Sequence, residues 1–240
     1  MGRLKRIGVQ LYTLRDQFKA DPAGTLAALA GMGYREVEFA GLHGHDAKEL
    51  RALLDANRIS APSGHFGLPA LTTDFEQTAR DAKILGHDYL VLADVPDEYR
   101  TAQGYEQAAA LMSDIARRCR KAGFQFGYHN HAFEFVPLEE RGGLCGYDLL
   151  LVGTAEAKVM MELDLFWIRR GGRDALGFFA RWPSRFRMVH VKDMDVDGAM
   201  VDVGAGAMDW STQRISDRST TPRYCPASAS ARSRSTFFRS

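Results

Sequence analysis

The chain has little cysteine, no long apolar run and no excess of one charge. Its 240 residues include three cysteines, Cys119, Cys145 and Cys225, which are far apart and show no Cys-x-x-Cys spacing. This excludes a disulfide framework or a zinc knuckle and predicts a reducing, cytoplasmic setting. No apolar stretch approaches the roughly 20 residues of a membrane span, and the basic N-terminus lacks the apolar segment of a secretory signal. We therefore expect no membrane partner.

The balanced net charge of +1 conceals two unlike parts of the chain. Residues 211–240 carry six arginines and one acid, Asp217, a net charge of +5, whereas residues 1–210 carry 25 basic and 29 acidic side chains, a net charge of −4. Proteins that hold a phosphate backbone need a basic surface. The acidic body therefore argues against a nucleic-acid partner.

Residues 1–210 alternate short apolar runs with segments of helical spacing, a pattern typical of a parallel sheet covered by helices. Helix boundaries are visible, for example the N-cap pair Asp21-Pro22 and the stop at Gly123. A TIM (β/α)8-type barrel is the favoured fold, and a doubly wound sheet is its competitor. Seven strands are expected: Arg6–Leu11, Arg35–Ala40, Ile59–Phe66, Tyr89–Ala93, Phe124–His129, Lys158–Leu163 and Arg187–Lys192.

An eighth unit is not visible in the sequence. Its strand should begin at about residues 215 to 225, given the usual length of a barrel, but the chain changes character near Trp210 and no strand-like run follows. We expect seven βα units over residues 1–210, a barrel incomplete at strand 8 and helix 8, and a Ser/Arg-rich tail over 211–240 that is disordered or non-native. A shifted reading frame would explain that tail.

Unusual polar residues follow the expected strands, where parallel α/β folds place their working residues. Each one alone has an ordinary packing or capping explanation, but their recurrence at successive strand ends predicts a shared site. Imidazoles and carboxylates without a thiolate suit a divalent metal ion, Mn, Co, Zn or Mg. The residues concerned are Glu38, His65, His129, Asn130, His131, Glu134, Glu162, Asp164, His190, Lys192 and Asp193.

Five ordered motifs carry a resemblance to a known family. They are the segment from Gly8 to Asp16, Gly127-Tyr128-His129-Asn130-His131 through Glu134-Phe135, Glu162-Leu163-Asp164-x-x-Trp167, His190-x-Lys192-Asp193, and Asp202-Val203-Gly204-x-Gly206-x-x-Asp209-Trp210. In this order they resemble the sugar phosphate isomerase/epimerase family. This is the xylose isomerase-like group of TIM barrels, which includes AP endonuclease-type enzymes, inosose dehydratases and ketose 3-epimerases.

The resemblance implies a divalent metal held by residues of strands 5 to 8. Asp164 and His190 match the sixth and seventh positions. For the fifth position the expected ligand is Glu134, with His129 or His131 as substitute ligands or substrate contacts. The fourth ligand would be a glutamate on strand 8, but the chain has no glutamate after Trp210.

The implied activity is that of a sugar, sugar phosphate or keto-sugar isomerase or epimerase that removes a proton next to a carbonyl, with the metal stabilising an enediolate. Glu134, His129 and His131 are the candidate acid–base groups. Glu38, His65, Trp167 and Lys192 are the candidate substrate contacts. Two alternatives stay open: a dehydratase or lyase acting on an inosose or 3-keto sugar, and an inactive truncated barrel that binds sugar without turnover. The resemblance is compatible with a homo-oligomer.

Overall fold

The computed structural model describes residues 7–209 and 236–239. Seven parallel strands form the wall of a barrel, in the order of their sequence from β1 to β7, and the predicted strands are confirmed to within two residues at each end. The strands are β1 (Ile7–Gln10), β2 (Glu36–Phe39), β3 (Ser60–Phe66), β4 (Tyr89–Leu92), β5 (Gln125–His129), β6 (Met160–Asp164) and β7 (Phe186–Val191).

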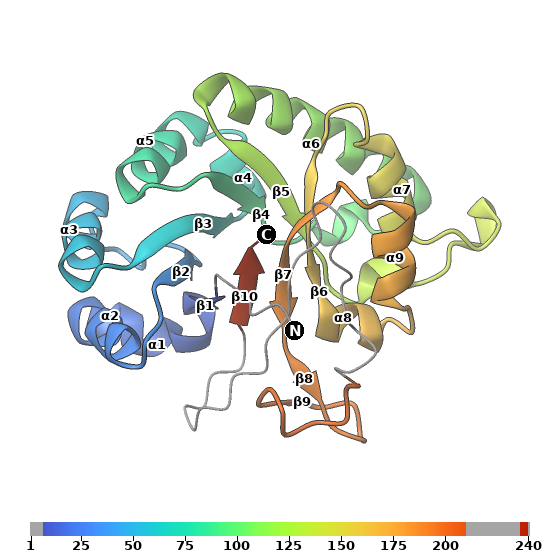
Figure 1. The fold of residues 1–240 in the computed structure, drawn as a ribbon. Helices are drawn as coiled ribbons and strands as arrows, with labels where there is room; N and C mark the ends of the chain where they lie inside the picture. The colour runs from blue at the N-terminus through green and yellow to red at the C-terminus, as the bar shows by residue number, and fades with distance from the viewer. Residues whose placement is uncertain (1–6, 210–235, 240) are drawn as a thin grey trace.

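Helices follow the strands and cover the outside of the wall (Figure 1). In α2 the Asp21 side chain accepts a hydrogen bond from the Gly24 N–H and proline occupies the first turn, as the sequence predicts. The helices are α1 (Arg15–Ala20), α2 (Pro22–Gly31), α3 (Ala47–Asn57), α4 (Leu68–Leu71), α5 (Phe75–Leu85), α6 (Ala102–Ala122), α7 (Gly146–Gly153), α8 (Leu165–Arg170) and α9 (Ala175–Arg181), with 3-10 turns η1 (Leu11–Leu14), η2 (Asp97–Tyr99), η3 (Phe133–Phe135) and η4 (Glu139–Arg141). None of the described helices is long and apolar enough to cross a membrane.

The eighth position of the wall is filled by a strand that the sequence did not predict. β10 (Thr236–Arg239) lies between β1 and β7 and runs antiparallel to both (Figure 1). Phe237 pairs with Gly8 on one side and with His190 on the other. The expectation that the tail contains no strand is therefore wrong for 236–239. Residues 211–235 and 240 lie outside the described residues.

The wall is closed, but among the described residues it lacks the eighth parallel βα unit of a (β/α)8 barrel, as the sequence predicts. Its closing strand is antiparallel, whereas the first seven strands belong to parallel βα units. Closure by β10 covers the strand edges that β1 and β7 would otherwise expose.

The core beneath the predicted site is apolar. Tyr89, Met160 and Met188 form a small buried cluster with Val91 on the inner face of the wall. Gly127 of β5 lies against this cluster, and a Cβ atom there would lie 2.6 Å from Cε of Met160, so the methionine side chain would have to shift. Since strand side chains alternate with period two, the next inward positions on β6 and β7 are Glu162 and His190. An apolar floor thus supports a polar layer directly above it.

Candidate metal centre

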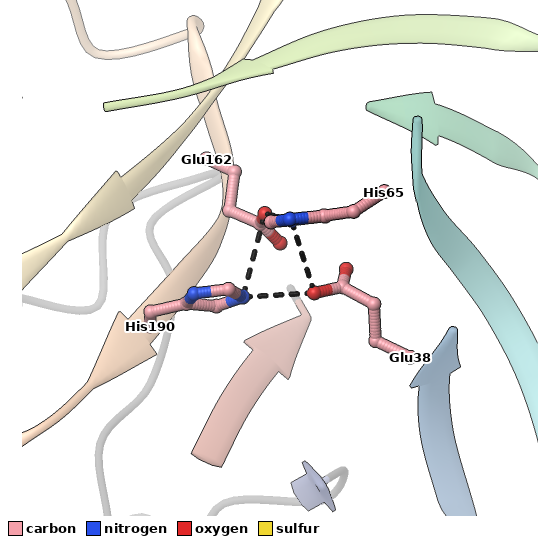
Figure 2. A group of neighbouring side chains, drawn as sticks. All are labelled: Glu38, His65, Glu162 and His190. Atoms are coloured by element: carbon pink, nitrogen blue, oxygen red, sulfur yellow. Dashed lines mark hydrogen bonds and ion pairs between the residues drawn. The ribbon is translucent and has the colours of Figure 1, made fainter. Parts of the chain in front are cut away.

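Two carboxylates and two imidazoles meet inside the barrel, and we call them the inner group: Glu38, His65, Glu162 and His190. They project from β2, β3, β6 and β7 toward one another (Figure 2). Nε2 of His65 lies 2.6 Å from Oε2 of Glu162 and 3.2 Å from Oε1 of Glu38. Nε2 of His190 lies 2.9 Å from Oε1 of Glu38 and 3.4 Å from Oε2 of Glu162.

The two glutamates of the inner group have different surroundings. Ser63 Oγ donates to Oε2 of Glu38 at 2.6 Å, and Gln10 Nε2 donates to Oε1 of the same carboxylate at 3.0 Å. Oε1 of Glu162 is buried and has no hydrogen-bond partner among the described residues. Both glutamates are fully buried. Because a buried carboxylate oxygen without a partner is costly, Oε1 of Glu162 is a position at which a cation would be stabilising.

A second set of donors, the outer group, consists of His129, Asp164 and His190. Nε2 of His129 lies 3.4 Å from Oδ2 of Asp164, and Nδ1 of His190 lies 3.7 Å from the same oxygen. Lys192 Nζ also contacts this oxygen, at 2.6 Å. His190 therefore faces the inner group with Nε2 and the outer group with Nδ1.

The start of α8 orients Asp164. Its Oδ1 accepts hydrogen bonds from the backbone N–H groups of Phe166 and Trp167, which is the N-cap arrangement, and its own N–H donates to Oδ1 of Asn130. The cap occupies one carboxylate oxygen and leaves Oδ2 for His129, His190 and Lys192. Local helix capping and the site geometry therefore depend on the same side chain.

Within the two groups, neighbouring charged side chains shift pKa values toward the charged forms. Burial opposes ionisation of Glu162, but His190 and His65 outweigh it and hold the pKa of Glu162 well below its usual range. Burial likewise opposes ionisation of Asp164, but the Lys192 ammonium and hydrogen bonds from the histidines hold the pKa of Asp164 well below its usual range. For His190, burial is outweighed by Glu162 and Glu38, which raise its pKa well above the usual value.

The two histidines that follow β5 are electrostatically different from His190. Burial lowers the pKa of His129 to about 3, despite a hydrogen bond to Asp164, and lowers the pKa of His131 to about 4. Both imidazoles are therefore neutral at pH 7, each with a nitrogen lone pair available to a metal or a proton. Nδ1 of His131 is buried and has no hydrogen-bond partner within the described part of the chain.

A cavity of about 720 Å³ opens onto these residues at the carboxyl ends of the strands. His65, His129, His131 and Lys192 line it, which brings together predicted residues from the ends of three strands, β3, β5 and β7. The sequence-based reasoning missed other lining side chains, although the first strand and its following turn belong to a recognised motif. These are Gln10, Tyr12, Thr13, Arg15, Phe66, Asp94 and Met200, and the predicted contact Trp167 completes the wall.

Glu134 does not lie where the sequence predicted. It belongs neither to the inner nor to the outer group, it is fully buried, and it is absent from the cavity lining. Its carboxylate accepts a hydrogen bond from the Tyr128 hydroxyl at 2.5 Å and from the His131 N–H at 2.9 Å. The η3 turn folds Glu134 back beneath its own strand end, so the geometry assigns it to holding His131 in place. His129 takes the expected position of Glu134 beside Asp164.

The burial of Glu134 gives the first testable prediction, which concerns stability and pH. Burial raises the pKa of this carboxyl to about 7, against 4.5 as its ordinary value. The folded state therefore binds more protons than the unfolded state between these pH values, and this carboxyl makes the free energy of unfolding fall as the pH rises from 4.5 to 7. The Glu134→Gln variant removes this contribution, which amounts to at most about 3 kcal/mol.

Urea denaturation of the wild type and of Glu134→Gln across pH 4.5 to 8 measures this effect. The difference in unfolding free energy between the two proteins isolates Glu134 from the histidines, whose lowered pKa values act in the opposite direction over the same range. Parallel stability curves for the two proteins would show that the pKa of Glu134 is not raised in the folded state.

Asp193 anchors the loop that follows β7. Its Oδ1 accepts from the N–H groups of Met194 and Met208, and its Oδ2 accepts from those of Gly204 and Gly206. This loop carries the hairpin of β8 (Asp193–Met194) and β9 (Met200–Val201) and brings Met200 to the cavity. A single buried carboxylate thus accepts hydrogen bonds from four backbone N–H groups at the edge of the site.

We expect Asp193→Asn to loosen this loop without unfolding the barrel. An amide offers one acceptor oxygen and turns an N–H donor toward backbone donors, which costs about 1 to 3 kcal/mol locally. Hydrogen exchange measured on peptides spanning 194–208 should become faster, while peptides from β4 and β5 should exchange as in the wild type. Unchanged exchange in the loop would show that Asp193 is not its anchor.

Both groups of donors fit a divalent metal. They combine imidazole nitrogens with carboxylate oxygens, and within each group the ligand atoms all lie within 4.8 Å of one another. Asp164 and His190 come together as predicted, and Glu38 and His65, expected as substrate contacts, lie in the inner group. The role of Glu162 was missed, although it stands in the recognised Glu-x-Asp motif.

The fold is similar to that of several solved TIM-barrel proteins. No protein-family model matches the chain. A sugar phosphate isomerase/epimerase from Parabacteroides distasonis superimposes with a TM-score of 0.75 at 24% identity, over 86% of this chain and 79% of that chain. A structure of L-ribulose 3-epimerase superimposes with a TM-score of 0.56 at 15% identity, over 85% of this chain and 74% of that chain. An AP endonuclease of family 2 is also among the structural neighbours.

Among curated proteins, the chain is similar to inosose dehydratase from Lacticaseibacillus casei, with 26% identity over 185 residues. The match covers 68% of this chain and 60% of that protein. The chain therefore spans less than two thirds of the length of this relative.

Proposed function

We propose that the chain is a metal-dependent enzyme of sugar metabolism, an isomerase or epimerase that moves a proton on a carbon next to a carbonyl. One observation carries the proposal: the outer group adjoins a cavity whose wall also holds a neutral His131 and the Lys192 ammonium. A metal, a base and a cation are the parts that enolisation requires. The similarity to isomerase, epimerase and dehydratase proteins supports the same chemistry.

His129, Asp164 and His190 would hold the metal. When bound there, a divalent ion supplies Lewis acidity to a carbonyl or hydroxyl oxygen of the sugar. The surrounding residues orient these ligands. Oδ1 of Asp164 is engaged by the start of α8, and Nδ1 of His129 lies 3.1 Å from the Ala93 carbonyl oxygen, which directs Nε2 toward Asp164.

His131 is the residue that we assign to proton transfer. It lines the cavity, its imidazole is neutral at pH 7, and its backbone is held by Glu134. Its ring stands 5.4 Å from that of Trp167, which forms one side of the cavity. His131 would take the proton from the carbon next to the carbonyl and return it to the same or the neighbouring carbon. Such acid–base assistance is worth about 10² to 10⁴ in rate.

Lys192 supplies a fixed positive charge beside the reacting group. Its Nζ contacts Asp164 at 2.6 Å and lies 5.9 Å from the centre of the Trp167 ring. The side chain is 10% exposed and lines the cavity. In this position the ammonium would stabilise the negative charge that develops on the substrate oxygen as the carbon loses its proton.

Dehydration is the second candidate reaction, and the similarity to inosose dehydratase favours it. Its first step is the same proton removal, after which a hydroxyl on the adjacent carbon leaves as water. The cavity residues that begin an epimerisation would therefore also begin a dehydration. The fate of the sugar distinguishes the two reactions.

Proton exchange in D₂O tests the proposal for both reactions. The Mn²⁺-loaded protein is mixed with 2-keto-myo-inositol, 3-ketoglucose or a free ketose, and deuterium incorporation and products are followed by NMR. We expect deuterium on the carbon next to the carbonyl of at least one compound, and a loss of about 10² to 10⁴ in rate for His131→Gln. The His45→Gln variant, altered outside the cavity, is the control.

Three outcomes separate the candidate functions. A rearranged sugar supports the isomerase or epimerase, and an unsaturated product supports the dehydratase. Binding of a sugar without exchange at any carbon would overturn the proposal and favour the barrel that binds without turnover.

A further inference from the structure

The inner group is separate from the donors that the proposed function uses. The outer group takes its carboxylate from Asp164, whereas the inner group takes carboxylates from Glu38 and Glu162. His190 is shared, but through different nitrogens, Nδ1 toward Asp164 and Nε2 toward the glutamates. The inner group is therefore a set of four donors to which the proposed reaction assigns no task.

The distances between the nitrogen and oxygen atoms of the inner group are close to those between ligand atoms around a bound metal ion. Its ligand atoms make contacts of 2.6, 2.9, 3.2 and 3.4 Å around the barrel interior (Figure 2). Around a tetrahedral zinc ion with bonds of about 2.0 to 2.2 Å, neighbouring ligand atoms lie roughly 3.4 Å apart. Outward movements of less than about 1 Å would convert the observed arrangement into such a shell.

The unpartnered oxygen of Glu162 is an independent indication of a ligand. Oε1 of Glu162 is buried without a hydrogen-bond partner among the described residues, on a side chain with no exposed surface. Within the described part of the chain, hydrogen bonds therefore leave one oxygen of the inner group without a partner, whereas Oε2 of the same carboxylate contacts His65 and His190. A cation would satisfy the remaining oxygen.

The surroundings of Glu38 match those of metal ligands in general. Ligating carboxylates are themselves hydrogen-bonded by a second set of residues, which orient them and hold their charge. Glu38 accepts from Ser63 at 2.6 Å and from Gln10 at 3.0 Å. Gln10 and His65 also line the cavity, so the cavity adjoins the inner group.

We propose that Glu38, His65, Glu162 and His190 bind a second divalent cation, separate from the ion held by His129, Asp164 and His190. Two imidazole nitrogens and two carboxylate oxygens suit Zn²⁺ or Co²⁺. The ion displaces the protons that the imidazoles and carboxylates share when no metal is bound. With both ring nitrogens bound, His190 would be an imidazolate between the two ions, and its remaining ring proton would pass to solvent.

The number of metal ions bound per chain tests this proposal directly. The full-length protein is stripped with a chelator, incubated with Zn²⁺, dialysed and analysed by mass spectrometry of the metal. We expect about two ions per wild-type chain and about one in Glu162→Gln or in Asp164→Asn, each of which removes a carboxylate from one group only. Glu134→Gln, which alters a buried carboxylate of neither group, is the matched control and should keep about two ions.

The variants distinguish failure of this proposal from failure of the proposed function. One ion that persists in Glu162→Gln and disappears in Asp164→Asn overturns the inner site and leaves the outer one intact. One ion with the reverse dependence supports the inner site and removes the metal from the proposed function.

Crystals of the wild type soaked in Zn²⁺ decide the matter without any variant. An anomalous peak in contact with Glu162 and His65 establishes the inner site even if Glu162→Gln does not fold. If a peak appears only beside Asp164, or nowhere, the four residues form a hydrogen-bonded ion network and the proposal is wrong.

Discussion

Asp164→Asn is expected to lower the rate of proton exchange by about 10³-fold. The substitution removes the negative charge that His129, His190 and Lys192 share at Oδ2. It weakens the proposed metal site, and it also removes the charge that holds the Lys192 ammonium beside the cavity. Both losses remove stabilisation of the same negative charge that develops on the substrate, so both lower the rate.

The fold should survive this substitution. The amide oxygen of asparagine can still accept from the N–H groups of Phe166 and Trp167, so the cap of α8 is retained. Asp174→Asn provides a matched control, because Asp174 caps α9 through Leu176 and Gly177 and belongs to neither metal group. Turnover, metal content and urea midpoint should be measured for both variants. Near wild-type turnover in Asp164→Asn would show that Asp164 is not part of the catalytic machinery.

Interrupting β10 should produce the largest loss of stability. Phe237→Pro removes a backbone donor in the middle of a strand that pairs on both sides, with Gly8 of β1 and His190 of β7. Proline is confined to edge strands for this reason, and we expect a loss of about 3 kcal/mol or more in unfolding free energy. The exposed edges of β1 and β7 should then promote association between chains.

Phe237→Val is the control for the closing strand, because valine keeps the backbone N–H and favours extended structure. Urea denaturation with light scattering compares the two variants. If Phe237→Pro has the stability and solubility of Phe237→Val, the barrel does not depend on β10 for its closure.

The parallel strands could be predicted because their signal is local. Each apolar run is mostly buried, and Tyr89–Leu92 is buried along its whole length. β10 could not be predicted in this way. It is four residues long and its partners are more than 40 residues distant, so its strand conformation depends on the gap between β1 and β7 rather than on its own sequence.

Prediction of side-chain direction succeeded where strand alternation determines it. His190 and Lys192 are two residues apart and both reach the site, from β7 and just beyond it. It failed at Glu134, because the η3 turn follows the strand and alternation no longer applies there. Glu38 was expected to contact substrate, but Ser63 and Gln10 hold its carboxylate beneath the cavity, a placement that depends on contacts across three strands.

The antiparallel direction of β10 determines where the described chain ends. Thr236 pairs with Val191, near the cavity, whereas Arg239 pairs with Met188, which belongs to the apolar layer beneath the metal groups. The strand therefore runs from the level of the cavity toward the opposite mouth of the barrel. A purification tag or a surface anchor joined to the C-terminus should emerge on that side, leaving the cavity of an immobilised protein open to solution.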